Sequence, residues 1–150
     1  MDRNQIETSG GVVIVGAGVA GLFCALKLAP HPVTLISATP LGDSFGATMQ
    51  ADIAAAVAAG DSPDAHAADM IAAGGGLVDA SAALALARDA SAVIEDLMRL
   101  GVAFDRDHNG RLATSRAAAH ATRRILSVHG DFTGQAIIAA LSVAVRATPS

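Results

Sequence analysis

The apolar residues near the start of the chain follow first the pattern of a buried strand and then that of a helix. Residues 12–15 are four consecutive aliphatic side chains, as expected for a parallel strand covered on both faces. A longer apolar run from Val19 to Ala29 predicts a helix, and residues 33–37 predict a second strand. A strand, a crossover helix and a second, parallel strand form a βαβ unit, which we expect to organise the chain.

Helical periodicity dominates the pattern after residue 50. Helices are expected at residues 53–59, 63–73, 82–100 and 135–146. Ser62 and Pro63 are typical of the cap and first position of the second of these helices, and Asp79 or Ser81 would cap the third. The third helix would face the core with an apolar stripe of Leu86, Ala90, Val93, Leu97 and Leu100.

Shorter elements separate these helices. Residues 102–105 and 112–114 predict two short strands around an Asn109-Gly110 turn. Residues 38–50 form a loop, and a loop of this length within a domain is often functional. Asp131 or Thr133 would cap the last helix.

Three glycines follow the first strand at the GxGxxG spacing, namely Gly16, Gly18 and Gly21. The first permits a tight turn, the second lets the backbone approach a pyrophosphate, and the third lets the helix pack closely on the strand. The N–H groups at the start of the helix and the positive end of its dipole would face the phosphates. Because the turn lies between a strand and a helix, it predicts a dinucleotide site; the alternative is a βαβ unit whose turn binds no nucleotide.

The end of the second strand bears on which dinucleotide is bound. In many dinucleotide-binding folds this strand ends in an acidic residue that holds the adenosine ribose. Here the strand ends in Ser37 and Ala38. The missing acid weakens the case for NAD and is more compatible with a flavin.

Composition and charge limit the remaining function classes. The 150 residues are 52% apolar with four Phe and neither Trp nor Tyr, so one domain with an aliphatic core is expected. The net charge of −4 and the absence of a long basic run argue against nucleic acid as a partner. The single Cys24 is expected to be buried and cannot form an intrachain disulfide, which suits a cytoplasmic protein. Residues 1–10 lack the features of a signal peptide, and Lys27 and the glycines interrupt the following apolar run, so no membrane segment is expected.

Few titratable residues are spaced as catalytic or metal-binding groups. His66 and Asp69 lie three residues apart, but without a suitably spaced third ligand they are expected on a solvated helix face, and no metal site is predicted. Arg123 and Arg124 are flanked by His120 and His129, and this arrangement leaves anion binding open as an alternative. No acid–base pair is visible, so no catalytic residue is assigned.

Several segments of the chain carry a family resemblance. They are GAGVAGL, a second strand ending in Ser, IAAAV, GDSPDAHAADMIAAGGGLVD, GVAFDRD, HxxRRIL and GDxTG. Together they resemble the L-aspartate oxidases, a group within the fumarate reductase and succinate dehydrogenase flavoprotein family. The resemblance covers residues 11–150 and only the N-terminal part of a much longer enzyme.

This resemblance implies FAD as cofactor and the oxidation of L-aspartate to iminoaspartate, the first step of NAD biosynthesis, with oxygen or fumarate as electron acceptor. The residues that would contact FAD are Gly16, Ala17, Gly18, Val19, Ala20, Gly21, Ser37, Ala38, Phe45, Gly46, Ala47, Thr48, Met49, Gln50, Ala51 and Asp52. Residues 17–20 would contact the pyrophosphate, Ala38 would stand where the family often has Lys, and residues 45–52 would lie along the flavin and the substrate entrance.

The chain departs from the family's motifs beside the expected flavin and substrate. Ala51 and Asp52 replace two glycines of Ala-Gln-Gly-Gly-Ile, and Asp52 would add negative charge near a reduced flavin and a dicarboxylate substrate. In Arg-Glu-Gly-Gly-His-Ser, the Glu expected to orient the substrate ammonium is Ala117 here. Residues 127–131, Ser-Val-His-Gly-Asp, stand where the family has His-x-Gly-Gly-Asp. The structural motifs of the chain therefore match the family better than the residues expected beside the flavin and the substrate do.

We predict an α/β fold: a Rossmann-like, FAD-binding βαβ domain that is incomplete because it is the N-terminal part of a two-domain flavoprotein. Residues 1–10 would be a polar tail, and residues 11–150 the N-terminal part of the FAD-binding domain. Whether this chain is active alone stays open. Two alternatives remain: a non-catalytic nucleotide-binding module, favoured by Asp52 and Ala117, and a relative that acts on fumarate or succinate.

Overall fold

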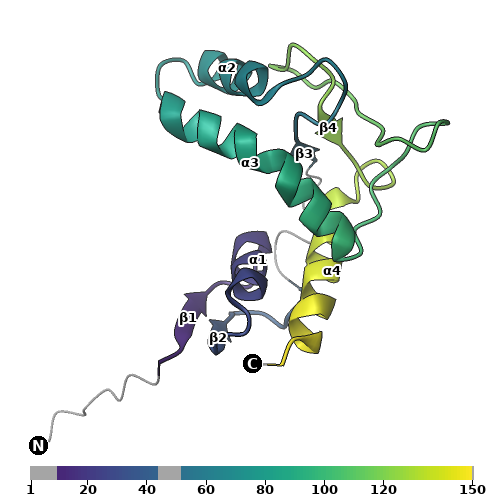
Figure 1. Cartoon of the computed structure of the whole chain (residues 1–150). Coiled ribbons are helices and arrows are strands. Elements are labelled where there is room, and N and C mark those ends of the chain that lie inside the picture. Colours follow the sequence, from purple (N-terminus) through teal and green to yellow (C-terminus); the bar gives the residue numbers. More distant parts are fainter. Residues whose placement is uncertain (1–9, 44–51, 150) are drawn as a thin grey trace, which may run out of the picture.

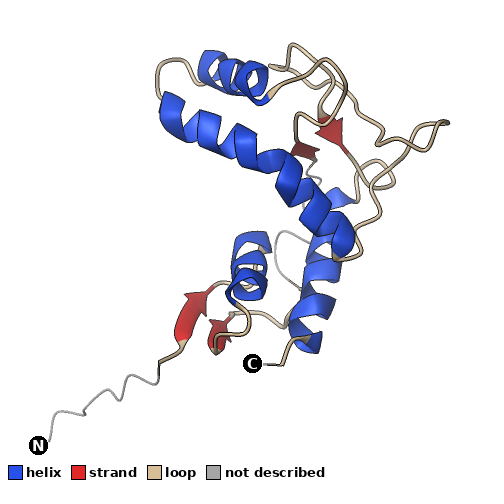
Figure 2. Ribbon diagram, in the orientation of Figure 1, coloured by secondary structure: helices blue, strands red, loops and turns tan. Residues whose placement is uncertain are grey.

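Four strands and four helices make up the part of the chain that the computed structural model describes, residues 10–43 and 52–149. In chain order they are β1 (Val12–Val15), α1 (Val19–Leu28), β2 (Val33–Ile36), β3 (Ile53–Ala54), α2 (Pro63–Ala73), α3 (Ala80–Arg99), β4 (Ile125–Leu126) and α4 (Thr133–Ala147). The elements β1, α1, β2 and α4 lie together at one end, and α2, β3 and β4 lie at the other, with the long α3 reaching from α2 toward α4 (Figure 1). Helices form most of the regular structure at both ends (Figure 2).

The predicted βαβ unit is present at the start of the described chain. Strands β1 and β2 pair in parallel, with Val12 opposite Val33 and Val15 opposite Ile36. Their carboxyl ends therefore lie at the same edge, where the turn into α1 and the residues after β2 begin. This edge is where open parallel sheets bind ligands.

The main core lies where α1, α3, α4 and the short strands meet. It is built from aliphatic side chains and Phe104, as the composition predicts, and includes Leu22, Ile94, Leu97, Leu126, Ile138 and Leu141. A smaller cluster of Ala67, Ala83 and Ala87 lies between α2 and α3. The alanines allow these two helices to pack closely.

The β1–β2 sheet is poorly covered. Val13 is 61% exposed, Val15 is 82% exposed and Ile36 is 51% exposed. Within residues 10–43 and 52–149 this sheet has two strands. Because parallel sheets are normally covered on both faces, these apolar side chains form a surface that further polypeptide would be expected to cover.

The helix predicted at residues 53–59 is wrong. Residues 53 and 54 instead form β3, which pairs antiparallel with β4, and the Ala55 N–H continues this contact by donating to the Arg124 carbonyl at 3.0 Å. The long-range pairing outweighs the helix propensity of the alanines. Strand β3 thus connects the segment before α2, through backbone hydrogen bonds, to the segment before α4.

The helices at 63–73, 82–100 and 135–146 are confirmed with small shifts of their ends, but two details differ. Leu86 of the predicted stripe is 68% exposed, whereas Leu97 is buried and Ala90, Val93 and Leu100 pack against the main core. Helix α3 also buries Ala83, Ala87 and Ile94, which the prediction did not include. Neither Asp131 nor Thr133 caps α4, whose N-cap residue is Phe132.

Other local expectations are partly confirmed. Ser62 caps α2 by accepting from the Ala65 N–H at 3.1 Å, and Asp79 caps α3. The Asn109-Gly110 turn is present, but its flanking strands reduce to one bridge between Arg106 and Leu112. Cys24, expected to be buried, is exposed. None of the described helices has both the length and the apolar character needed to cross a membrane.

Candidate functional site

The turn between β1 and α1 has a geometry that requires glycine at two positions. Gly16 has a φ of +109°, which L side chains rarely adopt, and its N–H donates to the Ile36 carbonyl at 2.8 Å. A Cβ on Gly21 would lie 1.9 Å from the Gly16 carbonyl oxygen. These two glycines therefore hold the start of α1 directly against the end of β1.

Gly18 lies in open space at the N-cap of α1. Its φ is −79°, and a Cβ added there would meet nothing within 4 Å. No side chain of the described residues caps this helix, so the first N–H groups of α1 have no partner within the helix. The turn therefore offers both room and unpaired donors to an anion, and the helix dipole favours negative charge at this point.

The residues after β2 lie at the same edge as the turn. Because Val15 pairs with Ile36, Gly16 and Ser37 each follow a paired strand end. Ser37 and Ala38 are exposed, and the Ser37 hydroxyl oxygen accepts a hydrogen bond from the Thr39 N–H at 3.4 Å. The structure thus brings the predicted residues 16–21 to the same edge as 37–38.

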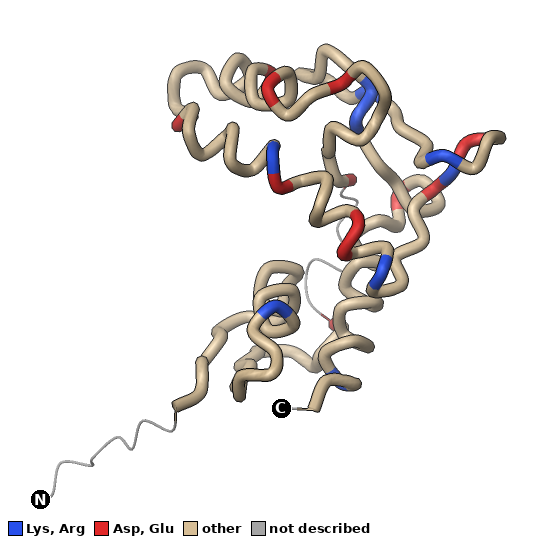
Figure 3. Tube along the Cα trace, viewed as in Figure 1, with Lys and Arg blue, Asp and Glu red and all other residues tan. Residues whose placement is uncertain are grey.

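The βαβ unit carries little charge of its own (Figure 3). Within residues 10–42 the charged side chain is Lys27, in the last turn of α1, where its ammonium forms an ion pair with Asp96 of α3. Any attraction of this turn for phosphate must therefore come from its backbone N–H groups and from the helix dipole.

Asp52 is the described member of the expected flavin loop, since Phe45 to Ala51 lie outside the described residues. Its Oδ1 accepts a hydrogen bond from the Thr133 hydroxyl at 3.2 Å, and this hydroxyl accepts one from the Val128 N–H at 2.9 Å. Thr133 is the first residue of α4, where the helix dipole favours a nearby carboxylate. Asp52 is therefore held at the start of α4 by a hydrogen bond that glycine at this position cannot make.

Ala117 lies in an exposed segment whose backbone conformation favours glycine. Within the described residues, the non-glycine residues with positive φ are Ala119 at +67° and His129 at +45°. Each stands where the family resemblance places a glycine. This chain therefore has a side chain at two positions whose positive φ favours glycine.

Arg124 is completely buried and is bound by two carboxylates. Its Nε and Nη2 donate to the two carboxylate oxygens of Asp61 at 2.9 and 2.8 Å, and its Nη1 donates to Asp69 at 2.6 Å. The Nη2 also donates to the Thr122 hydroxyl at 2.6 Å. Because its donors are used in this way, Arg124 is not available to an anion, and the anion-binding alternative is wrong for this residue.

This cluster also corrects the expectation for α2. His66 is 5% exposed, and Asp69 binds Arg124, so the two residues do not lie on a solvated face. The hydrogen bonds from Arg124 hold the pKa of Asp61 below its ordinary value, and that of Asp69 is lowered first by the Ala121 N–H and then by Arg124. Sequence reasoning missed this cluster because Asp69 and Asp61 precede Arg124 by 55 and 63 residues. The two carboxylates lie in the GDSPDAHAAD motif and the arginine lies in the HxxRR motif, so these motifs are the signals that could have indicated the contact.

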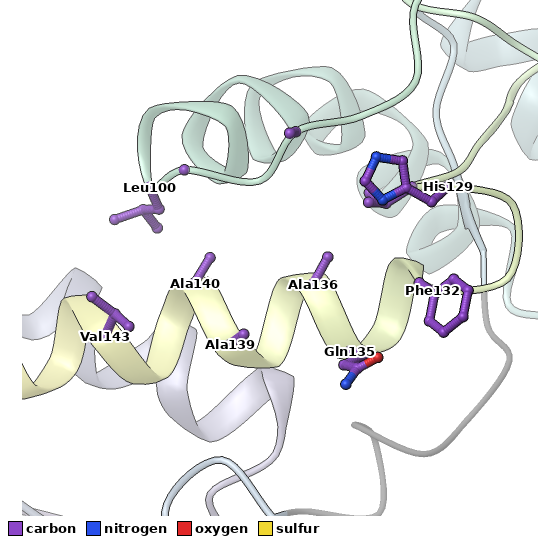
Figure 4. A pocket seen from close by; sticks show the side chains of 11 residues that line it. Leu100, His129, Phe132, Gln135, Ala136, Ala139, Ala140 and Val143 are labelled. Atoms are coloured by element: carbon purple, nitrogen blue, oxygen red, sulfur yellow. The ribbon is translucent and has the colours of Figure 1, made fainter.

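A separate groove runs along the exposed face of α4 (Figure 4). Its volume is about 780 Å³, and its walls include Leu100, Phe132, Ala136, Ala140 and Val143. His129 is the titratable side chain that lines it. The side chains that line this groove are mostly apolar.

Comparisons with known proteins place this fold among flavoproteins. The chain superposes on the E. coli quinol fumarate reductase FrdA with a TM-score of 0.86 at 24% identity, over 93% of this chain and 24% of that one. It superposes on Mycobacterium smegmatis Sdh1 with a TM-score of 0.81 at 28% identity, over 88% of this chain and 23% of that one. The fold is therefore that of the FAD-binding domain of the fumarate reductase and succinate dehydrogenase flavoproteins.

The sequence defines the family directly. Residues 11–149 match the model of the FAD binding domain family, and the chain belongs to this family. It is 46% identical over 142 residues to the L-aspartate oxidase of Mesorhizobium japonicum and 47% identical over 139 residues to that of Agrobacterium fabrum. These alignments cover 94% and 92% of this chain but 28% and 27% of the relatives' length. The predicted resemblance and the prediction of FAD as cofactor are confirmed.

The residues of the turn fit this cofactor. Gly18 leaves space where a pyrophosphate would approach, and the uncapped start of α1 supplies N–H donors. Gly16 and Gly21 fulfil the other two roles predicted from the GxGxxG spacing.

Proposed function

We propose that this chain is the FAD-binding, N-terminal part of an L-aspartate oxidase and that its β1–α1 turn holds the FAD pyrophosphate. The observation that carries the proposal is the open space at Gly18 beside the uncapped start of α1. In this proposal the βαβ unit is Rossmann-like and residues 11–150 belong to the FAD-binding domain, with residues 1–10 as a tail.

The residue roles follow from the geometry of the turn. The N–H groups of residues 17–20 donate to the pyrophosphate, and Ser37 and Ala38 lie toward the adenosine at the same sheet edge. Residues 45–52 remain the predicted flavin loop, with Asp52 attached to Thr133 at its end. A carboxylate fixed in this way has its charge partly offset by the N-terminus of α4, which reduces the repulsion expected from Asp52 near a reduced flavin.

The proposed substrate is L-aspartate. The aligned relatives are named L-aspartate oxidase, and bound FAD would supply the two-electron oxidation of the amino acid to iminoaspartate, the first step of NAD biosynthesis. Oxygen or fumarate would accept the electrons, and the fumarate reductases among the structural relatives support fumarate. A cytoplasmic location is proposed with this function.

A second candidate is a non-catalytic FAD-binding module, and Ala117 favours it. Its methyl group is exposed and cannot accept a hydrogen bond from a substrate ammonium, as the family's Glu would. Acquired departures of this kind would leave cofactor binding intact while removing substrate orientation.

The binding proposal is tested by titrating the purified chain with FAD and comparing Gly18→Val with Gly10→Val. Both glycines have open surroundings and lack a positive φ, so both variants should fold. Valine at position 18 fills the space proposed for the pyrophosphate, and we expect FAD affinity to fall at least about tenfold, or about 1.4 kcal/mol. The Gly10→Val control should bind like the parent chain. Equal affinity in the Gly18→Val and parent chains would contradict the proposed site.

Catalysis requires a separate assay, namely hydrogen peroxide formed on addition of L-aspartate to the FAD-loaded chain. Turnover by the parent chain would support the oxidase. FAD binding without turnover, in both the parent and an Ala117→Glu variant, would favour the non-catalytic module.

A further inference from the structure

The contact between α2 and the segment before β4 contains a buried histidine with an unpaired ring nitrogen. His66 of α2 is 5% exposed, and its Nδ1 has no hydrogen-bond partner among the described residues. Its ring lies 5.6 Å, centroid to centroid, from the ring of His120, and the His120 Nδ1 is 3.4 Å from Nη1 of Arg124. Two titratable rings are thus packed beside a permanently charged guanidinium.

The same cluster fixes the exposed segment that contains Ala117. One carboxylate oxygen, Oδ2 of Asp69, accepts two hydrogen bonds. Nη1 of Arg124 donates one at 2.6 Å, and the backbone N–H of Ala121 donates the other at 2.8 Å. At the other end of the segment, the Ser115 carbonyl accepts the backbone N–H of Arg124 at 3.0 Å. Residues 115–121 are therefore anchored at both ends to groups of this cluster.

Charged groups surround His66 on two sides. Asp61 precedes α2 and Asp69 belongs to it, while Arg124 and His120 come from the opposite segment. Helix α3, which also packs against α2, contributes the apolar Ala83 and Ala87 to that contact. A proton on His66 would therefore be placed in a desolvated contact next to an existing positive charge.

We propose that His66 of α2, whose ring lies beside that of His120, is an acid-sensitive latch: it holds residues 115–121 against α2 while neutral and releases them when it becomes protonated. This inference is independent of the proposed function, because it concerns a local opening of the chain and not cofactor binding.

The direction of the pH dependence follows from the environment of His66. Burial, and then the charges of Arg124 and His120, lower its pKa, and the opposing effects of Asp61 and Asp69 are smaller. The released histidine regains its ordinary pKa of about 6.5 and binds a proton more readily than the latched one. The latch is therefore fully stabilised above about pH 6.5 and loses stability as the pH falls below that value.

The test is amide hydrogen exchange followed by NMR on the whole chain between pH 7.5 and 5, with each rate corrected for its intrinsic pH dependence. The protection of the Ala121 N–H, which donates to Asp69, should fall by up to about tenfold per pH unit below about 6.5. The Ile138 N–H in the core of α4 should keep its protection, because the opening is local. Loss of protection at both amides together, or at neither, would overturn the latch.

Two variants identify the responsible group. His66→Phe removes the titratable ring at similar size, so the Ala121 protection should no longer depend on pH. His108→Gln, in the exposed turn, should leave the dependence unchanged. A dependence that persists in His66→Phe contradicts the proposal.

A measurement on the unmodified chain covers the case in which His66→Phe fails to fold. The ring resonances of His66 should titrate below the ordinary histidine pKa of about 6.5, because burial lowers the pKa of this side chain. Titration of His66 at or above that value would overturn the latch.

Discussion

Ala119 shows how a single residue can retain a backbone conformation that its own side chain disfavours. Its φ of +67° is one that glycine adopts freely, whereas alanine there is destabilised by about 1–2 kcal/mol. The family resemblance places a glycine at this position. Alanine at this φ places a local strain in the segment that contains Ala117.

We predict that Ala119→Gly stabilises the chain by about 1 kcal/mol, because relief of this strain exceeds the entropy that glycine adds to the unfolded state. Urea unfolding measures the change. Ala118→Gly is the matched control, since Ala118 is exposed and has no positive φ, and it should be neutral or destabilising by up to about 1 kcal/mol. If the two variants are destabilised alike, the strain at Ala119 is absent.

Arg124 gives a prediction of the opposite sign. Arg124→Met should reduce the free energy of unfolding by about 3–5 kcal/mol, because it leaves the 2%-exposed carboxylate of Asp61 without its partner. Arg123→Met, at an exposed neighbour, should cost less than about 1 kcal/mol. Similar losses in the two variants would show that the buried pair is unimportant.

The pH dependence of unfolding gives a second readout of the same pair. Since Arg124 lowers the pKa of Asp61 in the folded chain, this pair contributes stability above the ordinary pKa of about 3.9 and loses it as the pH falls further. That part of the acid destabilisation should be weaker in Arg124→Met. If the free energy of unfolding falls equally with decreasing pH in Arg124→Met and in the parent chain, the assignment to Asp61 is contradicted.

At the scale of elements, local patterns predicted what local chemistry decides. The strand, glycine turn and helix, the Ser62 cap and the Asn109-Gly110 turn depend on neighbouring residues and were predicted correctly. The helix at 53–59 was predicted wrongly because β3 pairs with β4 more than 70 residues away, as Ile53 opposite Leu126 shows. The Arg124 cluster escaped prediction for the same reason.

The contact between β1 and α1 gives a prediction at this scale. Gly21→Ala would place a Cβ 1.9 Å from the Gly16 carbonyl oxygen, so α1 must move away from β1. We expect a destabilisation of about 1–3 kcal/mol, measured by thermal or urea unfolding. Gly18→Ala adds a Cβ that meets nothing within 4 Å, so this variant should be destabilised by much less than Gly21→Ala. Equal stability of the two variants would mean that the third glycine has no packing role.

At the scale of the whole molecule, the chain presents a complete glycine turn beside an incompletely covered sheet. The exposed Val13, Val15 and Ile36 lie on the strands that position the turn. The chain spans 28% of the length of the Mesorhizobium japonicum relative, so the remaining cofactor contacts of such an enzyme lie outside this alignment. In the proposed function, the glycine turn is the part of the cofactor site that the described residues supply.

The cofactor-binding turn could be predicted from the sequence, whereas the positions of the altered side chains could not. The GxGxxG spacing identified residues 16–21, and the structure places them at the same sheet edge as Ser37 and Ala38. It did not predict that Asp52 would bind Thr133, because that contact joins segments 81 residues apart. Short-range motifs thus indicated the cofactor, whereas the positions of the altered side chains required the fold.

The central claim is that FAD binds at the β1–α1 turn, and amide chemical shifts measured during an FAD titration test it most directly. The account predicts that the largest shifts occur at the N–H groups of residues 17–20 and that they disappear in Gly18→Val. Shifts confined to the apolar groove around Phe132 and Ala136, with residues 17–20 unaffected, would contradict it.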